Sequence, residues 1–483
     1  MLFDTPLYLL FLGLIVTAYW RLGFRHQNVL LLLASYFFYG WWDWRFLSLI
    51  GISTLVDYYC ALAIAGSSDS VKRKLLLTFS VSINLGFLGF FKYFGFFSQS
   101  LHTALAAFGI EVPQLVLDVL LPPGISFYTF QALAYIVDVY FKRMQPSKNL
   151  IDYALFICFF PHLIAGPIQR PSHLLPQTQN PRHFDGEKVF SGLQLIFWGL
   201  FRKCVVADSC GLLANAAFDG RLGPASLPTL LIGMYAFAWQ IYGDFSGYSD
   251  IARGSAQLLG FHFMVNFRQP YLSRSLQEFW RRWHISLSTW FRDYLYIPLA
   301  LTETARRIEN ISLVETIILV LTFLFSGLWH GANWTFIVWG LIHGVGLAME
   351  ELMSKFGWLT ITKQPERNAL SSSQAWLKRI VVFHCVGIAL VFFRAPSVSA
   401  AFQFLQGTTV WNWRPEYGSA AVYLAFFSLP LFFLDLALES RQEEYLFEHT
   451  AGWHIRVAGA VAASVVTLLF SANQANAFIY FQF

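Results

Sequence analysis

Charged residues are scarce in this chain of 483 residues, because Asp, Glu, Lys and Arg together make up only 13% of it. Soluble proteins carry roughly a quarter, so the composition excludes a disordered chain, a coiled coil and an ordinary cytosolic enzyme. The net charge of +5 is too small to indicate nucleic-acid binding. Cysteine is scarce as well, and the five cysteines include no CxxC pair, so we expect neither a disulfide framework nor a metal site.

Apolar and aromatic residues are abundant instead, at 56% and 18% of the chain, and the mean hydropathy is +0.51. We therefore predict an all-α polytopic membrane protein in which roughly eleven helices cross the bilayer, each needing about 20 apolar residues, together with re-entrant and interfacial helices. The first segment is interpreted as a retained helix, because Asp4 stands where a signal peptide would be basic. The candidate spans are 5–20, 28–41, 45–66, 75–98, 115–141, 150–168, 188–206, 227–251, 312–328, 332–351, 376–394, 418–437 and 456–471.

The basic loops predict how the first five spans are oriented, because Lys and Arg near span ends stay on the cytoplasmic side. Arg21 and Arg25 follow the first span, and further basic residues at 72–74 and 142–148 follow the third and fifth. The loop 99–114 between the fourth and fifth spans has no Lys or Arg. The N-terminus is therefore expected outside.

Segment 268–298 carries its aromatic residues at steps of three and four and its arginines on the opposite side. This pattern predicts an amphipathic helix that lies in the cytoplasmic membrane interface, most clearly over 275–298. Arg281 and Arg282 take the polar side, and His284 lies at the edge between the two sides. His284 is a candidate functional residue, and the alternative is an interfacial histidine in contact with lipid headgroups.

The run FSGLWHGANW at 325–334 joins two strongly apolar stretches. Gly327, Gly331 and Asn333 are expected to break the helix and to leave His330 inside the membrane. A neutral imidazole at such a place can accept a proton from a hydroxyl, which is the task of a general base. The alternative is a structural histidine that is bonded to a neighbouring helix.

Other polar residues in apolar segments suggest a framework around this histidine. Asp244, Asp250 and Arg253 lie in or at the end of one span, and Asp250 and Arg253 have the spacing of an ion pair on a helix. We interpret these three residues as a structural polar network. The Pro-Pro-Gly break that opens 122–140 is typical of backbone lining a cavity at membrane depth, and this segment is expected to line the same cavity as His330.

Five separated blocks together resemble the membrane-bound O-acyltransferase family, in particular its bacterial branch of alginate O-acetylases, peptidoglycan O-acetyltransferases and teichoic-acid D-alanyl transferases. In order along the chain they are PPGISFYTFQALAYIVDVY at 122–140, FFPHLIAGPIQR at 159–170, YGDFSGYSDIARG at 242–254, EFWRRWHISLSTWFRDYLYIPL at 278–299 and FSGLWHGANWTFIVWGLIHG at 325–344. The resemblance covers about residue 5 to 483. It implies one transmembrane domain over 1–483, with a ring of tilted helices around a central tunnel.

The resemblance also implies roles for individual residues. His330 corresponds to the catalytic histidine of the family, and His284 corresponds to its second functional histidine. Arg281, Arg282, Asn333 and Trp329 are expected to contact substrate. The tail FIYFQF at 478–483 is similar to an acyl-relay motif in which the tyrosine, here Tyr480, takes the acyl group. The alternative for this tail is an aromatic anchor at the membrane interface.

The function that follows is O-acetylation of an exported polysaccharide such as alginate, by a multi-pass enzyme of the bacterial inner membrane. Acetyl-CoA is the expected cytoplasmic donor, although an acidic carrier protein would suit the same arginines. Membrane lipids and a periplasmic acetyltransferase of the SGNH type are the expected partners, and no bound cofactor is expected. The alternatives are a peptidoglycan O-acetyltransferase, D-alanyl transfer to teichoic acid and, in another class, a transporter or flippase.

Overall fold

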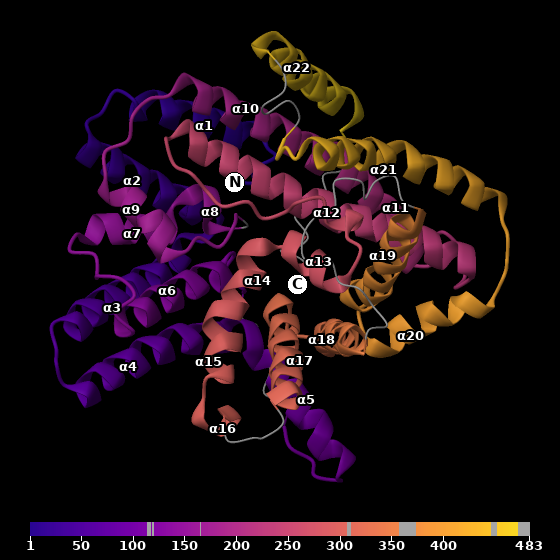
Figure 1. Cartoon of the computed structure of the whole chain (residues 1–483), viewed down its shortest axis with the longest axis horizontal. Coiled ribbons are helices and arrows are strands. Elements are labelled where there is room, and N and C mark those ends of the chain that lie inside the picture. The colour runs from indigo at the N-terminus through magenta and orange to yellow at the C-terminus, as the bar shows by residue number, and fades with distance from the viewer. Residues whose placement is uncertain are drawn as a thin grey trace. The chain divides into compact units, whose positions relative to one another are not determined.

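The computed structural model describes residues 1–471 except 114–116, 118–119, 165, 307–310, 357–372 and 446–451, and every regular element in these residues is a helix (Figure 1). The chain forms two compact units. Unit 1 comprises residues 1–196 and 251–264, and unit 2 comprises residues 197–250 and 265–483. The prediction of one domain over 1–483 stays a prediction.

Unit 1 is built from short and long helices. Its elements are α1 (Pro6–Tyr19), α2 (Phe24–Asp43), η1 (Trp44–Phe46), α3 (Leu47–Ala65), α4 (Ser70–Leu88), η2 (Gly89–Tyr93), α5 (Phe94–Ala107), α6 (Ile125–Tyr140), α7 (Leu150–Cys158), α8 (Phe160–Leu163) and α9 (Pro171–Gln179). Two helices, α10 (Gly186–Leu200) and α12 (Leu227–Leu258), contribute residues to both units.

Unit 2 holds the remaining helices. Its elements are η3 (Phe201–Ala207), α11 (Asp208–Phe218), η4 (Pro270–Leu272), α13 (Leu276–Arg282), α14 (Ile285–Phe291), η5 (Arg292–Tyr296), α15 (Ile297–Ala300), α16 (Glu303–Arg306), α17 (Ile311–His330), α18 (Trp334–Lys355), α19 (Ser373–Arg394), α20 (Val398–Gln406), η6 (Gly407–Thr409), α21 (Pro415–Arg441) and α22 (Trp453–Phe470).

Eight helical segments of the described chain are long and apolar enough to cross a membrane, which confirms a multi-pass, all-helical protein. They include α17, α18, α19, α21 and α22 of unit 2. The predicted number of eleven crossings is not confirmed by this set. The predicted span 150–168 is divided between α7 and α8, and the nine residues of α7 rise only about 14 Å, well short of the bilayer core of about 30 Å.

The interior of unit 1 contains a buried carboxylate. Asp57 on α3 accepts hydrogen bonds from Asn84 on α4, at 2.9 and 3.1 Å, and Ser53 donates to the Asn84 side chain at 2.7 Å. The Asp57 and Asn84 side chains are almost completely buried. Because each polar group has a partner, α3 and α4 can pack closely with α6 in an apolar surrounding (Figure 1).

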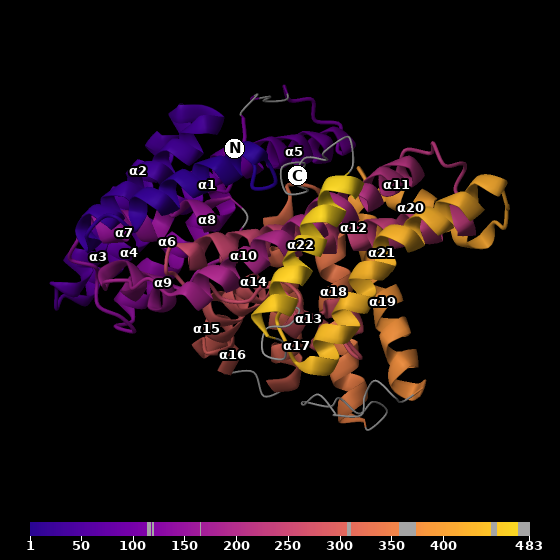
Figure 2. The ribbon, with the colours of Figure 1, turned by 90° about the horizontal axis from the view of Figure 1, so that it is seen from above.

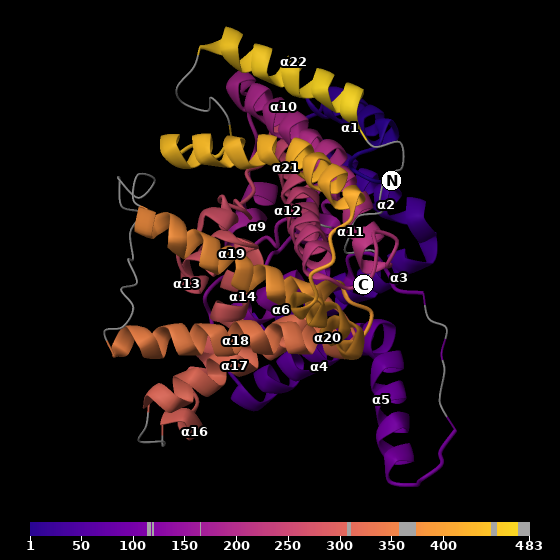
Figure 3. The ribbon, with the colours of Figure 1, turned by 90° about the vertical axis from the view of Figure 1, so that its right-hand side faces the viewer.

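The closest helix pair of unit 2 is α17 and α18, which lie side by side (Figure 3). Glycines permit this approach, because a Cβ atom on Gly327 would overlap the carbonyl oxygen of Phe336 and one on Gly340 would overlap that of Phe323. Helix α19 in turn lies beside α18 (Figure 2). These three helices form one wall of the candidate active site.

The predicted continuous amphipathic helix over 268–298 is wrong, because the segment is divided into α13, α14, η5 and α15. The break lies at Trp283 and His284, where His284 has a left-handed backbone with φ +42°. Two acceptors hold the start of α13: the Ser275 side chain accepts from Glu278 N–H at 3.0 Å, and Glu350 on α18 accepts from Leu276 and Gln277 N–H at 2.9 Å each. The predicted break before 125–140 is confirmed, since α6 follows Gly124 with φ +73°.

Candidate active site

His330 is the last residue of α17 and is almost completely buried. The predicted helix break is confirmed at Gly331 and Asn333, because α18 begins only at Trp334, but Gly327 lies within α17 and does not break it. Asn333 caps the new helix, since its side chain accepts from Thr335 N–H at 3.1 Å and donates to the Pro396 carbonyl at 3.1 Å. Both ends of this amide therefore contact the protein backbone, and the predicted substrate contact of Asn333 stays a prediction.

Aromatic side chains surround the His330 imidazole. The ring centroids of Trp339 and Phe393 lie 4.9 and 5.2 Å from that of His330, and Trp329 packs on it from the neighbouring position at 4.9 Å. A cavity of about 10 Å³, with room for about one water molecule, opens beside the imidazole. It is lined by Ile241, Tyr271, Phe279, Trp283, His330, Trp339, His343, Val386, Leu390 and Phe393.

His284 is completely buried, and its ring lies 4.5 Å from that of Phe245, centroid to centroid. The centroids of the His284 and His330 rings are 6.5 Å apart, and Trp329 lies 5.9 Å from His284. Neither ring nitrogen of His284 has a hydrogen-bond partner among the residues that the structure describes. This residue lies outside the candidate spans, and burial lowers the pKa of its imidazole to about 3, so the ring is neutral at physiological pH.

The two histidines, which are distant in the sequence, are thus brought together in a largely apolar surrounding. A neutral imidazole has one nitrogen that can accept a proton and one N–H that can donate a hydrogen bond. Apolar walls strengthen both interactions because little water competes for them. The arrangement can therefore remove a proton from a hydroxyl and donate a hydrogen bond to a negatively charged oxygen.

His343 on α18 was not among the predicted site residues, yet it lines the cavity. Its ring centroid lies 4.9 Å from that of Trp339 and 5.1 Å from that of Trp280, and it stacks on Phe279 with an interplanar angle of 6°. The available signal was its spacing, because His343 follows Trp339 by one helical turn and so lies on the same face.

The two predicted donor-binding arginines have different surroundings. Arg282 is largely buried and forms a two-pronged ion pair with Glu439 at 2.7 and 2.9 Å, and it also contacts Glu278 at 2.7 Å. Arg281 is exposed and donates to the Gln277 side chain at 3.3 Å. Both arginines line a separate charged cavity of about 380 Å³ between α13 and the end of α21. Of these two arginines, only Arg281 is exposed to solvent.

The predicted polar network includes basic residues that the sequence interpretation did not name. Lys203 is buried between Asp208 and Asp244, at 2.7 and 2.9 Å, and Arg202 pairs with Asp250 at 2.7 Å. Both basic residues belong to η3, and two adjacent charges within an apolar span were the available signal. Arg253 belongs to unit 1, so its predicted pairing with Asp250 stays a prediction.

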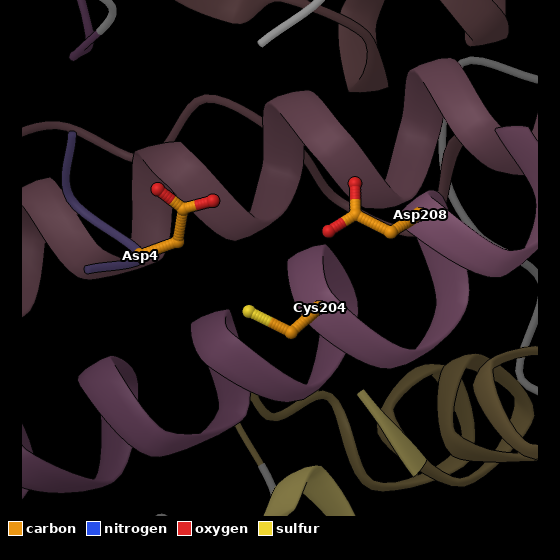
Figure 4. A group of neighbouring side chains, drawn as sticks. All are labelled: Asp4, Cys204 and Asp208. Carbon is orange, nitrogen blue, oxygen red and sulfur yellow. The ribbon is translucent and has the colours of Figure 1, made fainter. Parts of the chain in front are cut away.

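Cys204 of η3 lies one turn before Asp208, the network residue that pairs with Lys203 (Figure 4). Asp4, which is also drawn there, belongs to unit 1, and no site is built from it together with the other two residues. Tyr480, the predicted relay residue, lies outside the described residues. Its position relative to His330 therefore forms no part of the site geometry.

Comparison with known proteins identifies the relatives of this chain. Residues 141–394, just over half of the chain, match the model of the membrane-bound O-acyltransferase family. The chain is 40% identical to a probable alginate O-acetylase of Azotobacter vinelandii over 83% of this chain and 77% of the relative. It is 40% identical to one from Pseudomonas aeruginosa, over 84% and 74%, and 33% identical to a peptidoglycan O-acetyltransferase of Helicobacter pylori, over 84% and 79%.

The contrast between the two arginines predicts different effects of the same substitution. Arg282→Gln leaves Glu278 and Glu439 without their shared cation in a largely buried place, so we expect a loss of stability of about 3 kcal/mol. Arg281→Gln, the matched control, removes only an exposed contact and is expected to change stability by less than about 1 kcal/mol. Thermal unfolding of the purified variants in detergent measures both. Equal melting temperatures for the two variants would contradict the structural role of Arg282.

Proposed function

The chain belongs to the membrane-bound O-acyltransferase family and is an O-acyltransferase, and from this premise we propose that it moves acetyl groups from cytoplasmic acetyl-CoA to an exported polysaccharide through His330 and His284. The observation that carries the proposal is the pair of buried histidine rings with centroids 6.5 Å apart, of which His330 lines the aromatic cavity. The names of the relatives support alginate as the polysaccharide, and peptidoglycan is the second candidate because its acetyltransferase aligns with most of the chain.

In the proposed reaction His330 acts as the general base. Its imidazole accepts the proton of the attacking hydroxyl, proposed to be that of Tyr480. At the same time the new oxygen–carbon bond forms at the thioester carbonyl of acetyl-CoA. The carbon–sulfur bond then breaks, and the proton passes from His330 to the departing thiolate of CoA. His284 is neutral and has no hydrogen-bond partner among the described residues, so one N–H is available to the oxygen that becomes negative.

The donor is proposed to approach the end of α13 at which Arg281 is exposed. The polyanionic phosphates of acetyl-CoA would be attracted to this cation, whereas Arg282 is engaged by Glu278 and Glu439. The five arginines of segment 268–298 support a cytoplasmic location for this end, and the proposed location of the protein is the bacterial inner membrane. A periplasmic acetyltransferase partner would then pass the acetyl group to the polymer, with Tyr480 as the proposed relay.

Substitution of His330 tests the proposed base. His330→Ala is expected to leave a folded, membrane-inserted protein and to lower acetyl transfer about 10²- to 10⁴-fold. The matched control is His384→Ala, because His384 on α19 is engaged by the Tyr235 hydroxyl at 2.7 Å and lines a different groove. Acetyl content of the exported polymer, measured at equal protein levels, compares the two. Near-normal acetylation in His330→Ala would contradict the assignment.

Substitution of Tyr480 tests the relay, since Tyr480→Phe removes one oxygen and keeps the aromatic ring. We expect the variant to bind the donor but to lose transfer to the polymer. Mass spectrometry of the wild type after incubation with labelled acetyl-CoA should find the label on the peptide 472–483. If the tail is only an interfacial anchor, Tyr480→Phe will be active and this peptide will carry no label.

A further inference from the structure

The backbone at His284 adopts a conformation that histidine seldom takes. Its φ of +42° and ψ of +53° lie in the left-handed region, which is unfavourable for residues with a Cβ atom. Such residues persist only where surrounding contacts hold them, and they gather at functional sites. The neighbouring sequence contains neither glycine nor proline to cause the break. The cause therefore has to be found in contacts from other segments.

The contacts at the start of α14 come from Asn266. A residue that caps a helix commonly uses its own side chain as the acceptor, but His284 makes no such bond. Instead the Asn266 carbonyl accepts from Ile285 N–H at 2.9 Å, and Asn266 Oδ1 accepts from Ser286 N–H at 3.1 Å and from the Ser286 hydroxyl at 2.9 Å. One buried asparagine thus caps α14, and the imidazole of His284 takes no part in the cap.

Residues 266–268 also contact the other side of the turn. Arg268 N–H donates to the Arg282 carbonyl at 2.9 Å, so contacts from residues 266–268 enclose Trp283 and His284. Asn266 is itself anchored, because its Nδ2 donates to the Ser249 hydroxyl on α12 at 3.2 Å. All of these residues belong to unit 2, and Asn266, Ser249 and Ser286 are almost completely buried.

We propose that Asn266 is a positioning residue of the acyl transfer, which fixes the left-handed turn at His284 and so aims its imidazole at His330. Without the Asn266 side chain, the N–H and hydroxyl of Ser286 lose their shared acceptor at the start of α14, and a right-handed His284 that continues α13 becomes the competing conformation. That change turns the side chain away from its place 6.5 Å from His330. The inference rests on the proposed role of His284 in the reaction.

A double-mutant cycle tests whether Asn266 acts through His284. Asn266→Ala in the otherwise wild-type protein is expected to lower kcat about 10- to 100-fold, with the donor KM changed less than about 3-fold. In the His284→Ala background the same substitution is expected to lower kcat less than about 2-fold, because the imidazole it positions is absent. Asn266→Asp keeps an oxygen for Ser286 and should recover most of the activity.

The matched control is Asn84→Ala in unit 1, which removes an equally buried, hydrogen-bonded asparagine. It is expected to lower the melting temperature but to leave kcat unchanged, both in the otherwise wild-type protein and in the His284→Ala background. Should Asn266→Ala not yield folded protein, Ser249→Ala removes only the anchor of Asn266 and is expected to give a smaller loss that also disappears in the His284→Ala background.

Two results would overturn the inference, and they differ from failure of the proposed function. Equal losses from Asn266→Ala in both backgrounds, or a change confined to KM, would mean that Asn266 does not act through His284. Unchanged hydrogen exchange in the peptide 284–291 of Asn266→Ala would mean that the cap does not hold the turn. Full activity of His284→Ala alone would instead contradict the proposed role of His284.

Discussion

Backbone groups that leave a helix inside a membrane protein have to find partners in other segments, because the bilayer supplies none. Both histidines of the site lie at such breaks. His330 ends α17, and Asn333 caps the helix that follows, while His284 directly precedes α14, whose first turn is capped by Asn266. Each break is therefore held by hydrogen bonds that are separate from the imidazole. The two rings lie 6.5 Å apart, next to helix starts that are capped by asparagine side chains.

The distribution of charge supports the same arrangement. Several charged side chains of unit 2 pair with one another and do not line the cavity, as in Lys203 with Asp208 and Asp244, and in Arg282 with Glu439. The wall of the cavity is aromatic and aliphatic apart from the polar groups of His330, His343 and Tyr271. Hydrogen bonds made by a neutral imidazole are strong in such a surrounding. The enzyme can in this way offer a base and a hydrogen-bond donor within the membrane without burying an unpaired charge there.

The helical membrane fold and the break at His330 follow from local sequence, because long apolar runs, Gly331 and Asn333 determine the backbone conformation at their own positions. The break at His284 could not be predicted in this way, since its cause is Asn266, 20 positions before the Ser286 that it contacts. The pairing of Arg282 with Glu439 joins residues 157 positions apart, so an amphipathic pattern alone assigned this arginine to the solvent side. His343 required knowledge of which face of α18 meets the cavity. The local sequence made His330 a candidate base with a structural alternative, and the family resemblance then implied functional roles for both histidines.

A structure of the protein with a non-hydrolysable acetyl-CoA analogue would test the central claim most directly. The account predicts that the acetyl carbonyl lies between His284 and His330, with the rings of Trp339 and Phe393 displaced, because the cavity of about 10 Å³ is smaller than an acetyl group. The CoA phosphates are expected near Arg281. An acetyl group bound away from both histidines, for example in the groove beside Tyr235 and His384, would contradict the assignment of this cavity as the active site.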